Sequence, residues 1–284
     1  TGPLLRQLPP IVPRRIGRLR ADAPGVFRTD AFTVLRVVPE AEHAELLLPF
    51  PAGGAVIEIA PSPTCDLPSC GFDVGSTALV TAADGTYDLF TVLAVTGRTL
   101  SLRHLGTGAH PPYAAGSPVL VAETATFHLD TAAHILRRYD GDSADDPSVD
   151  DVVGVGVEYY GGGEPPRWPR GVLGVGNCLY ESDGTYRSAL LPILPGPVPS
   201  AVPLTGAMLS DGPWCGIGGN RFDADLLRVR QVRVTLRLQA SDPAVRGADR
   251  GRFRVPGVAS QGGAMVQDVT VVAGVGPRNL RTGW

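Results

Sequence analysis

The side chains best suited to chemistry crowd into the acidic segment (residues 140–151), which reads "DGDSADDPSVDD". It contains six aspartates: Asp140, Asp142, Asp145, Asp146, Asp150 and Asp151. Carboxylate oxygens are the ligands that hard cations such as Ca²⁺ take. An EF-hand loop beginning at Asp140 is excluded, because Ala144 stands at position five and Asp145 replaces the required glycine at position six.

Two interpretations of the acidic segment remain. The first is a non-standard calcium loop with Asp140, Asp142, Asp145 and Asp146 as the ligands. The second is a solvated turn between two strands, because aspartate and glycine are typical turn residues. We expect the turn, with no catalytic duty and with calcium, at most, as a stabilising ligand.

Other catalytic patterns are missing from the sequence. The five histidines form no H-E-x-x-H motif, and no G-x-S-x-G elbow supplies a serine nucleophile. No G-x-G-x-x-G follows a strand and opens a helix. We therefore expect a protein that is not an enzyme and carries no cofactor beyond the calcium alternative.

Every cationic side chain is an arginine, 25 in all, and the net charge is -3. Arginines outnumber aspartates between residues 221 and 254, so this region is locally basic. Four of them are candidate contacts for an anion, for DNA or for a protein partner: Arg228, Arg230, Arg233 and Arg237. The favoured interpretation is the wet face of a strand, paired with the acidic segment or a neighbouring subunit, because few aromatic residues interleave.

The four cysteines predict two disulfides rather than a zinc site, because no C-x-x-C pair is present. Cys65 and Cys70 flank a short turn, and we expect them to pair. Cys178 and Cys215 would fasten a proline-rich loop. In the chain-entropy model, closing a loop of this size stabilises the folded protein by about 3–4 kcal/mol. Two disulfides predict export to an oxidising compartment: periplasmic, cell-surface or extracellular. No apolar run is long enough to span a membrane in this chain.

Glycine (36) and proline (27) are frequent enough to predict many short elements and few long helices. Residues 1–45 are expected to be an irregular segment rich in arginine and proline. Residues 46–122 predict a small β subdomain, a barrel or meander, with "ADG" as a hairpin turn. Residues 123–284 predict a β-rich head containing a disulfide-fastened loop at 161–222.

The longest strand signal covers residues 231–239. Alternating apolar residues place Val232, Val234, Leu236 and Leu238 on one face. We expect this strand to be an inner one, paired near 152–159 or with the terminal strand 268–273, with Leu236 buried. A slip in the alternation at Arg230 and Gln231 predicts a β-bulge or a boundary between two elements.

The order of five segments resembles one known family. These segments are "CGFDVGSTALVTAADGTYDLFTVLAVTGRTLSLRHL", "YAAGSPVLVAETATFHLD", "VDDVVGVGVEYYG", "DADLLRVRQVRVTLRLQ" and "VTVVAGVGPRNLR". Together they resemble the W class of type IV pilus assembly proteins (PilW-like minor pilins) from about residue 70 to the end. The resemblance implies a mainly β fold: a pilin-like antiparallel sheet with an inserted small barrel or meander.

The function that the resemblance implies is structural. A minor pilin or pseudopilin takes part in assembling a type IV pilus or a filament like that of type II secretion, and its partners are other pilin or pseudopilin subunits. Family members begin with a long apolar helix that is not in this sequence, so we expect it to have been removed or supplied by another chain; counting it would make the fold α+β. The alternative is a secreted β-rich binding module for DNA or glycan.

Overall fold

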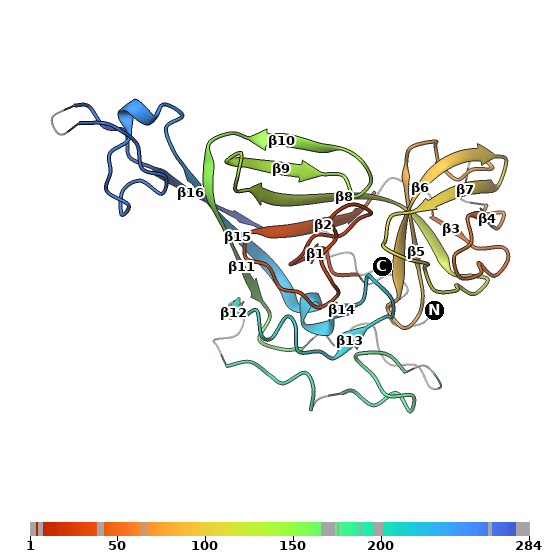
Figure 1. The fold of residues 1–284 in the computed structure, drawn as a ribbon. Coiled ribbons are helices and arrows are strands. Elements are labelled where there is room, and N and C mark those ends of the chain that lie inside the picture. The colour runs from red at the N-terminus through yellow and green to blue at the C-terminus, as the bar shows by residue number, and fades with distance from the viewer. Residues whose placement is uncertain are drawn as a thin grey trace.

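The structure is a computed structural model that describes residues 4, 8–38, 43–63, 65, 67–165, 174, 176–187, 189–195, 201–260 and 263–276. The protein is mainly β with antiparallel sheets, as predicted, and its described helices are two short 3-10 turns (Figure 1). The strands are β1 (Ile11–Val12), β2 (Ala31–Val37), β3 (His43–Glu45), β4 (Val56–Glu58), β5 (Thr77–Thr81), β6 (Tyr87–Thr96), β7 (Thr99–His104), β8 (Pro118–Asp130), β9 (Ile135–Tyr139), β10 (Asp145–Val149), β11 (Val152–Gly161), β12 (Val202–Leu204), β13 (Trp214–Cys215), β14 (Phe222–Asp223), β15 (Val229–Leu238) and β16 (Val269–Val275). The 3-10 turns are η1 (Ala224–Arg228) and η2 (Pro243–Val245).

A small barrel forms one side of the molecule (Figure 1). Its strands pair in the order β8-β5-β6-β7-β4, and β3 returns to pair with β8. The ring closes between β3 and β4, because Leu47 N–H donates to the Glu58 carbonyl at 2.8 Å and Ala60 N–H to the Glu45 carbonyl at 2.8 Å. A core of its own fills the barrel, including Phe50, Phe90 and Tyr113. The predicted hairpin joins β5 to β6, with Gly85 at φ 92°.

Strand β8 connects the barrel to the rest of the protein. Its first residues pair with β3 and β5 of the barrel, and its second half pairs with β2 and β9. Because one continuous strand serves both parts, they share a ten-stranded sheet. A second hydrophobic core, which includes Leu35, Leu120 and Tyr159, packs against this ten-stranded sheet.

A four-stranded sheet with the order β12-β11-β15-β16 contains the long strand that the sequence predicted. β15 lies between β11 and β16, so both predicted pairings occur. Tyr160 pairs with Gln231 and Gly161 with Val229, so Arg230 is the extra residue of the predicted β-bulge. Between β15 and β16 the chain leaves the sheet as the arm (residues 239–268), which projects from the molecule at the upper left of Figure 1.

Two predicted boundaries need correction. Residues 1–45 are not irregular throughout, because β2 inserts seven residues beside β8 and β3 begins the barrel. The predicted loop 161–222 contains β12, which extends the four-stranded sheet beside β11, and β13. β12 has three residues with a central proline and β13 has two residues, so neither shows a strand pattern in the sequence.

The two predicted disulfides, Cys65–Cys70 and Cys178–Cys215, are both present. Cys70 is buried in the barrel core, so the first bridge fixes the β4–β5 loop to the barrel. Cys178 and Cys215 are buried in the second core, so the second bridge fixes the long loop against the β13–β14 pair. None of the described residues forms a helix that is long and apolar enough to cross a membrane.

Candidate functional site

The acidic segment forms the turn between β9 and β10 and then β10 itself. One Asp140 carboxylate oxygen accepts the backbone N–H groups of Asp142, Ser143 and Ala144 at 2.8, 3.0 and 3.1 Å. Gly141 has φ 95°, a left-handed conformation that glycine adopts without strain. Asp140 therefore closes a turn with its side chain, which is the solvated-turn interpretation.

Asp142 points the other way, into the molecule. Its carboxylate forms an ion pair with Arg103 of β7, accepts a hydrogen bond from Thr91 of β6 at 3.2 Å, and lies 3.8 Å from Arg18. The turn is thus tied to the barrel and to the N-terminal segment by one carboxylate. Asp142 acts as a structural anion with two guanidinium partners, Arg103 and Arg18, from separate parts of the chain, and a neutral donor, Thr91.

The structure does not assemble the predicted calcium site. Asp145 faces His128 at 3.8 Å, and Asp146 is exposed in β10, while Asp140 and Asp142 are engaged as described above. At the end of β10, Asp151 accepts a hydrogen bond from Ser241 of the arm. The four proposed ligands therefore point to different partners, because a β-strand sends successive side chains to opposite faces.

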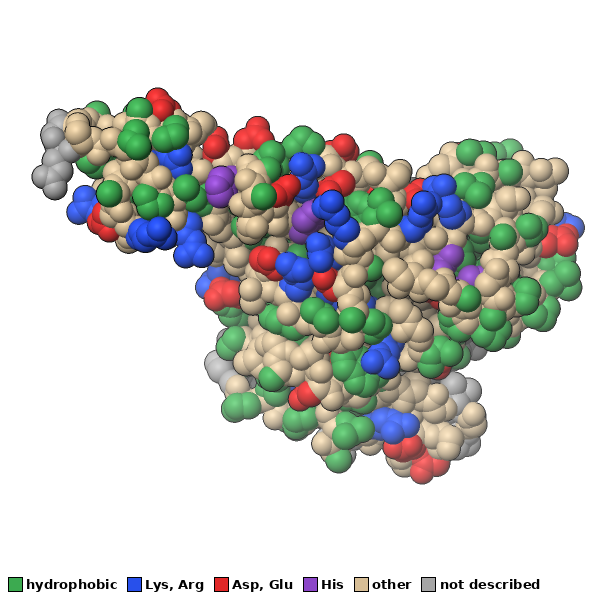
Figure 2. Space-filling model, in the orientation of Figure 1, with side chains coloured by type: hydrophobic (Ala, Val, Ile, Leu, Met, Phe, Trp, Pro, Cys, Tyr) green, Lys and Arg blue, Asp and Glu red, His purple; other side chains and the backbone are tan. Residues whose placement is uncertain are grey.

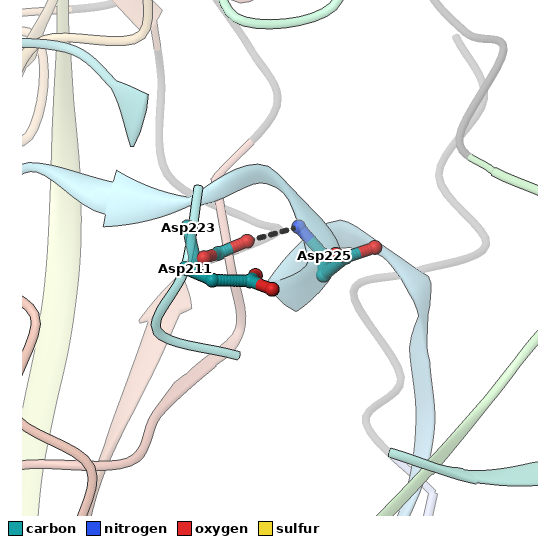
Figure 3. A group of neighbouring side chains, drawn as sticks. All are labelled: Asp211, Asp223 and Asp225. Carbon is teal, nitrogen blue, oxygen red and sulfur yellow. Dashed lines mark hydrogen bonds between the residues drawn. The ribbon is translucent and has the colours of Figure 1, made fainter. Parts of the chain in front are cut away.

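Within the described residues, a metal-sized cluster of carboxylates occurs elsewhere, in the acidic trio Asp211, Asp223 and Asp225 (Figure 3). One oxygen of each lies within 4.8 Å of the others. Asp211 is exposed in the loop before β13, whereas Asp223 ends β14 and Asp225 is in the first turn of η1, both buried. The trio forms because β13 pairs with β14 and brings the preceding loop over the start of η1.

Asp223 is the N-cap of η1. One of its oxygens accepts Asp225 N–H at 2.9 Å and the other accepts Gly212 N–H at 2.6 Å. The first bond caps η1, and the second joins the segment of Asp211 to that of Asp223 and Asp225. Asp225 forms an ion pair with the fully buried Arg228, whose Nε is 2.5 Å from Asp225 Oδ1, and Arg228 Nη1 donates to the Pro192 carbonyl at 2.9 Å.

Burial sets the acidity of the trio. It raises the pKa of Asp223 to about 6, with a further rise from the nearby Asp211 carboxylate and an opposing effect of the two backbone N–H groups. Burial likewise raises the pKa of Asp225 to about 7, and Arg228 offsets only part of that rise. Burial destabilises the charged form of Asp225 more than the nearby Arg228 guanidinium stabilises it. Asp223 and Asp225 therefore hold their protons toward the neutral range.

Three carboxylates from two segments could coordinate a hard cation or share protons among themselves. Only Asp211 is exposed, so most of the carboxylate oxygens face protein. In the sequence, Asp223 and Asp225 are two of the aspartates that oppose the arginines of residues 221–254. The one local signal for their role is an aspartate at a helix N-cap followed by an Asp–Arg pair at i,i+3.

The four predicted contact arginines do not form one surface. Arg228 is buried, so its prediction as a contact for DNA or a partner is wrong. Arg230 donates to the backbone carbonyls of Leu227 and Val229. Arg237 pairs with Asp268 at 2.8 Å, and Arg233, which is exposed, pairs with Glu158 at 3.4 Å and lies over the Tyr160 ring. Acidic and basic side chains are interspersed on the face seen in Figure 2.

An incompletely covered apolar face lies on the four-stranded sheet. Residues directly opposite one another across β15 and β16 share this face: Val232 with Val275, Val234 with Ala273, Leu236 with Val271, and Leu238 with Val269. The second core covers the end of the face at Tyr159 and Val232. Toward the arm the cover ends, and Val269 and Val271 are 57% and 44% exposed. At the other end Val275 is 53% exposed on the outermost strand, although Val232 opposite it is buried.

Leu236 is half-buried rather than buried, which corrects its predicted environment. The predicted register is present, because Leu236 lies opposite Val155 on β11 and Val271 on β16. Leu236 is only half-buried because, among the described residues, the layer that covers the sheet does not reach it. Leu236→Ala should therefore cost less than the roughly 2–5 kcal/mol typical of a fully buried leucine.

The fold and these surfaces define a mainly β, disulfide-bonded protein with an exposed apolar sheet face. No protein-family model matches the chain, and neither curated proteins nor solved structures yielded a match.

Proposed function

We propose that this protein is a non-enzymatic, exported subunit that binds other protein chains through the apolar face of its four-stranded sheet. The observation that carries the proposal is the exposure of Val269 and Val271 opposite the half-buried Leu238 and Leu236. Contiguous apolar surface of this kind is typical of protein interaction sites. A second layer contributed by a partner would complete the core that ends at Val232.

The particular assembly that we propose is a type IV pilus or a filament like that of type II secretion, with this protein as the head domain of a minor pilin or pseudopilin. The order of the five sequence segments supports it, and so does an antiparallel sheet with one uncovered apolar face. The two disulfides are typical of proteins that fold in an oxidising compartment, which fits export. The partners would be other pilin or pseudopilin subunits.

A binding module for DNA or glycan has less support. DNA binding rests on arginines available to phosphates, whereas Arg228 is buried and Arg237 is paired with a buried carboxylate, Asp268. Arg233 is exposed, but it already has Glu158 and Tyr160 as partners. A purely structural role also accommodates the acidic segment, where Asp140 and Asp142 have identified structural partners.

The test is genetic. Deletion of the gene in the organism that encodes this chain should abolish surface filaments or filament-dependent secretion, and the parent gene should restore them. Val269→Asp, which places a charge on the apolar face, should fail to restore assembly. Val258→Asp is the matched control, because Val258 is an exposed valine of the arm. Normal filaments and normal secretion in the deletion strain would refute the proposal.

A further inference from the structure

The free edges of the described sheets differ in how well they are protected. Natural sheets protect an edge by keeping it short or by placing proline or charge on it, because free backbone N–H and C=O groups invite another strand. The barrel closes on itself, which removes its edges. Apart from the pair β13–β14, whose strands have two residues each, four strands remain as edges of the described sheets: β1, β10, β12 and β16.

Three of these four edges are protected. β1 has only two residues and lies between prolines at positions 10 and 13. β10 contains Asp145, Asp146 and Pro147. β12 has three residues with Pro203 at its centre. None of these edges offers a long, uncharged row of backbone groups to an incoming strand.

β16 lacks every one of these protections. Its seven residues, "VTVVAGV", include no proline and no charge, and all seven are exposed. β15 occupies one side of β16, and among the described residues no strand or backbone group pairs with the other side. Valines stand on both faces: Val271 on the apolar face and Val272, which is 57% exposed, on the opposite one.

The chemistry of this edge selects its occupant. A free strand edge is completed by another extended strand that is itself free, and an uncharged one meets no repulsion from its own kind. A second copy of this chain supplies such a strand, because its own β16 is equally long, uncharged and unprotected. A two-fold symmetric contact would satisfy both edges with identical residues and would close at two copies.

We propose that two copies of this protein pair through β16, antiparallel and edge to edge, to form one continuous eight-stranded sheet. Full overlap of the seven-residue strands places Val272 opposite its symmetry mate. The two apolar faces then lie on the same side of the joint sheet and form one larger surface. The two arms extend from opposite ends, because each precedes its own β16. This pairing goes beyond the proposed function and concerns the edge of the sheet rather than its face.

Charge at Val272 provides the test. The purified parent should sediment with twice the mass of one chain in analytical ultracentrifugation. Val272→Lys and Val272→Glu should each sediment as single chains, because like charges would lie directly opposite each other at the two-fold axis. An equimolar mixture of the two variants should recover the dimer. Val258→Lys, on the arm, should remain dimeric like the parent.

Two results would overturn the pairing: a parent that sediments as a single chain at every concentration, or a Val272→Lys variant that stays dimeric. Val272→Cys gives an independent reading, since it should form a reducible cross-linked dimer and Val258→Cys should not. Thermal melts verify that each variant is folded. A monomeric parent would leave the filament proposal standing, whereas unaffected filaments in the deletion strain would leave the β16 dimer standing.

Discussion

The acidic segment and the acidic trio gather aspartates in opposite ways. The acidic segment holds six aspartates within twelve consecutive residues, yet its side chains diverge to a turn backbone, to Arg103, to His128 and to the arm. The acidic trio takes Asp211 from one loop and Asp223 and Asp225 from another segment, and brings their oxygens within 4.8 Å. Six aspartates close together in the sequence therefore form no cluster, whereas the pairing of β13 with β14 forms one from two segments.

The difference has an electrostatic consequence. The largely buried Asp142 of the acidic segment has the partly exposed Arg103 guanidinium as its partner, which compensates its charge. Asp223 and Asp225 are removed from water near each other, and their pKa values rise to about 6 and about 7. Burial, more than the number of neighbouring acids, separates a structural carboxylate from one that holds a proton.

The largest expected effect comes from breaking the buried pair of the trio. Asp225→Ala leaves Arg228 as a fully buried guanidinium without its carboxylate. Loss of one partner of a buried ion pair costs about 3–5 kcal/mol. Urea denaturation at pH 8, where Asp225 is charged, should show a loss of this size in the free energy of unfolding.

The control for that experiment replaces both members of the pair. Asp225→Leu combined with Arg228→Met removes both charges together and should recover most of the lost stability, because no charge is then left buried. Equal losses in the single and double variants would contradict the role assigned to the pair and would indicate a packing defect instead.

The second effect is a dependence of stability on pH. Unfolded aspartates lose their protons near pH 4, whereas Asp223 and Asp225 in the folded protein hold theirs until about pH 6 and 7. The folded state thus binds more protons between these values, and the free energy of unfolding falls as pH rises from about 4 to 7. The slope is up to about 1.4 kcal/mol per pH unit for each group.

Asp223→Asn isolates this contribution. The variant removes one titrating carboxylate and the repulsion that it exerts on Asp225, so the fall in stability from pH 5 to pH 7 should be shallower than in the parent. Urea midpoints at the two pH values measure it. A parent that becomes steadily more stable from pH 5 to pH 7 would contradict the raised pKa values.

Asp142→Ala tests the acidic segment and should have a smaller effect. The Asp142 carboxylate is largely buried, but Arg103 is partly exposed and can be solvated once its partner is gone. We expect a loss of about 1–2 kcal/mol, between the values for exposed and buried ion pairs. Asp142→Ala should not change the response of the melting temperature to added calcium, because the four predicted ligands do not converge.

Asp146→Ala should have the smallest effect. Asp146 is exposed in β10, so its removal should change the free energy of unfolding by no more than about 0.5 kcal/mol. Comparing the two variants shows whether Asp142 alone, rather than the acidic segment as a whole, contributes to the free energy of unfolding. A large loss in Asp146→Ala would mean that the acidic segment acts as a unit, which would revive the metal interpretation.

Local patterns predicted much of the fold. Alternation identified β15 and its partners β11 and β16, and the break in that alternation located the bulge at Arg230. The "ADG" turn located the β5–β6 hairpin, and the cysteine spacing gave both disulfides. Apart from the Cys178–Cys215 pairing, which spans 37 residues, each of these rests on residues close in sequence or on a pattern that the backbone repeats every two residues.

Other features depended on contacts between distant segments. The barrel closes through β3 and β4, each only three residues long, and the acidic trio forms only after β13 pairs with β14. The sequence alone placed Leu236 on an apolar face, and only the tertiary structure decided that this face is partly uncovered. Alternation determines which face of a strand a side chain occupies, whereas its burial depends on which other segment lies above that face.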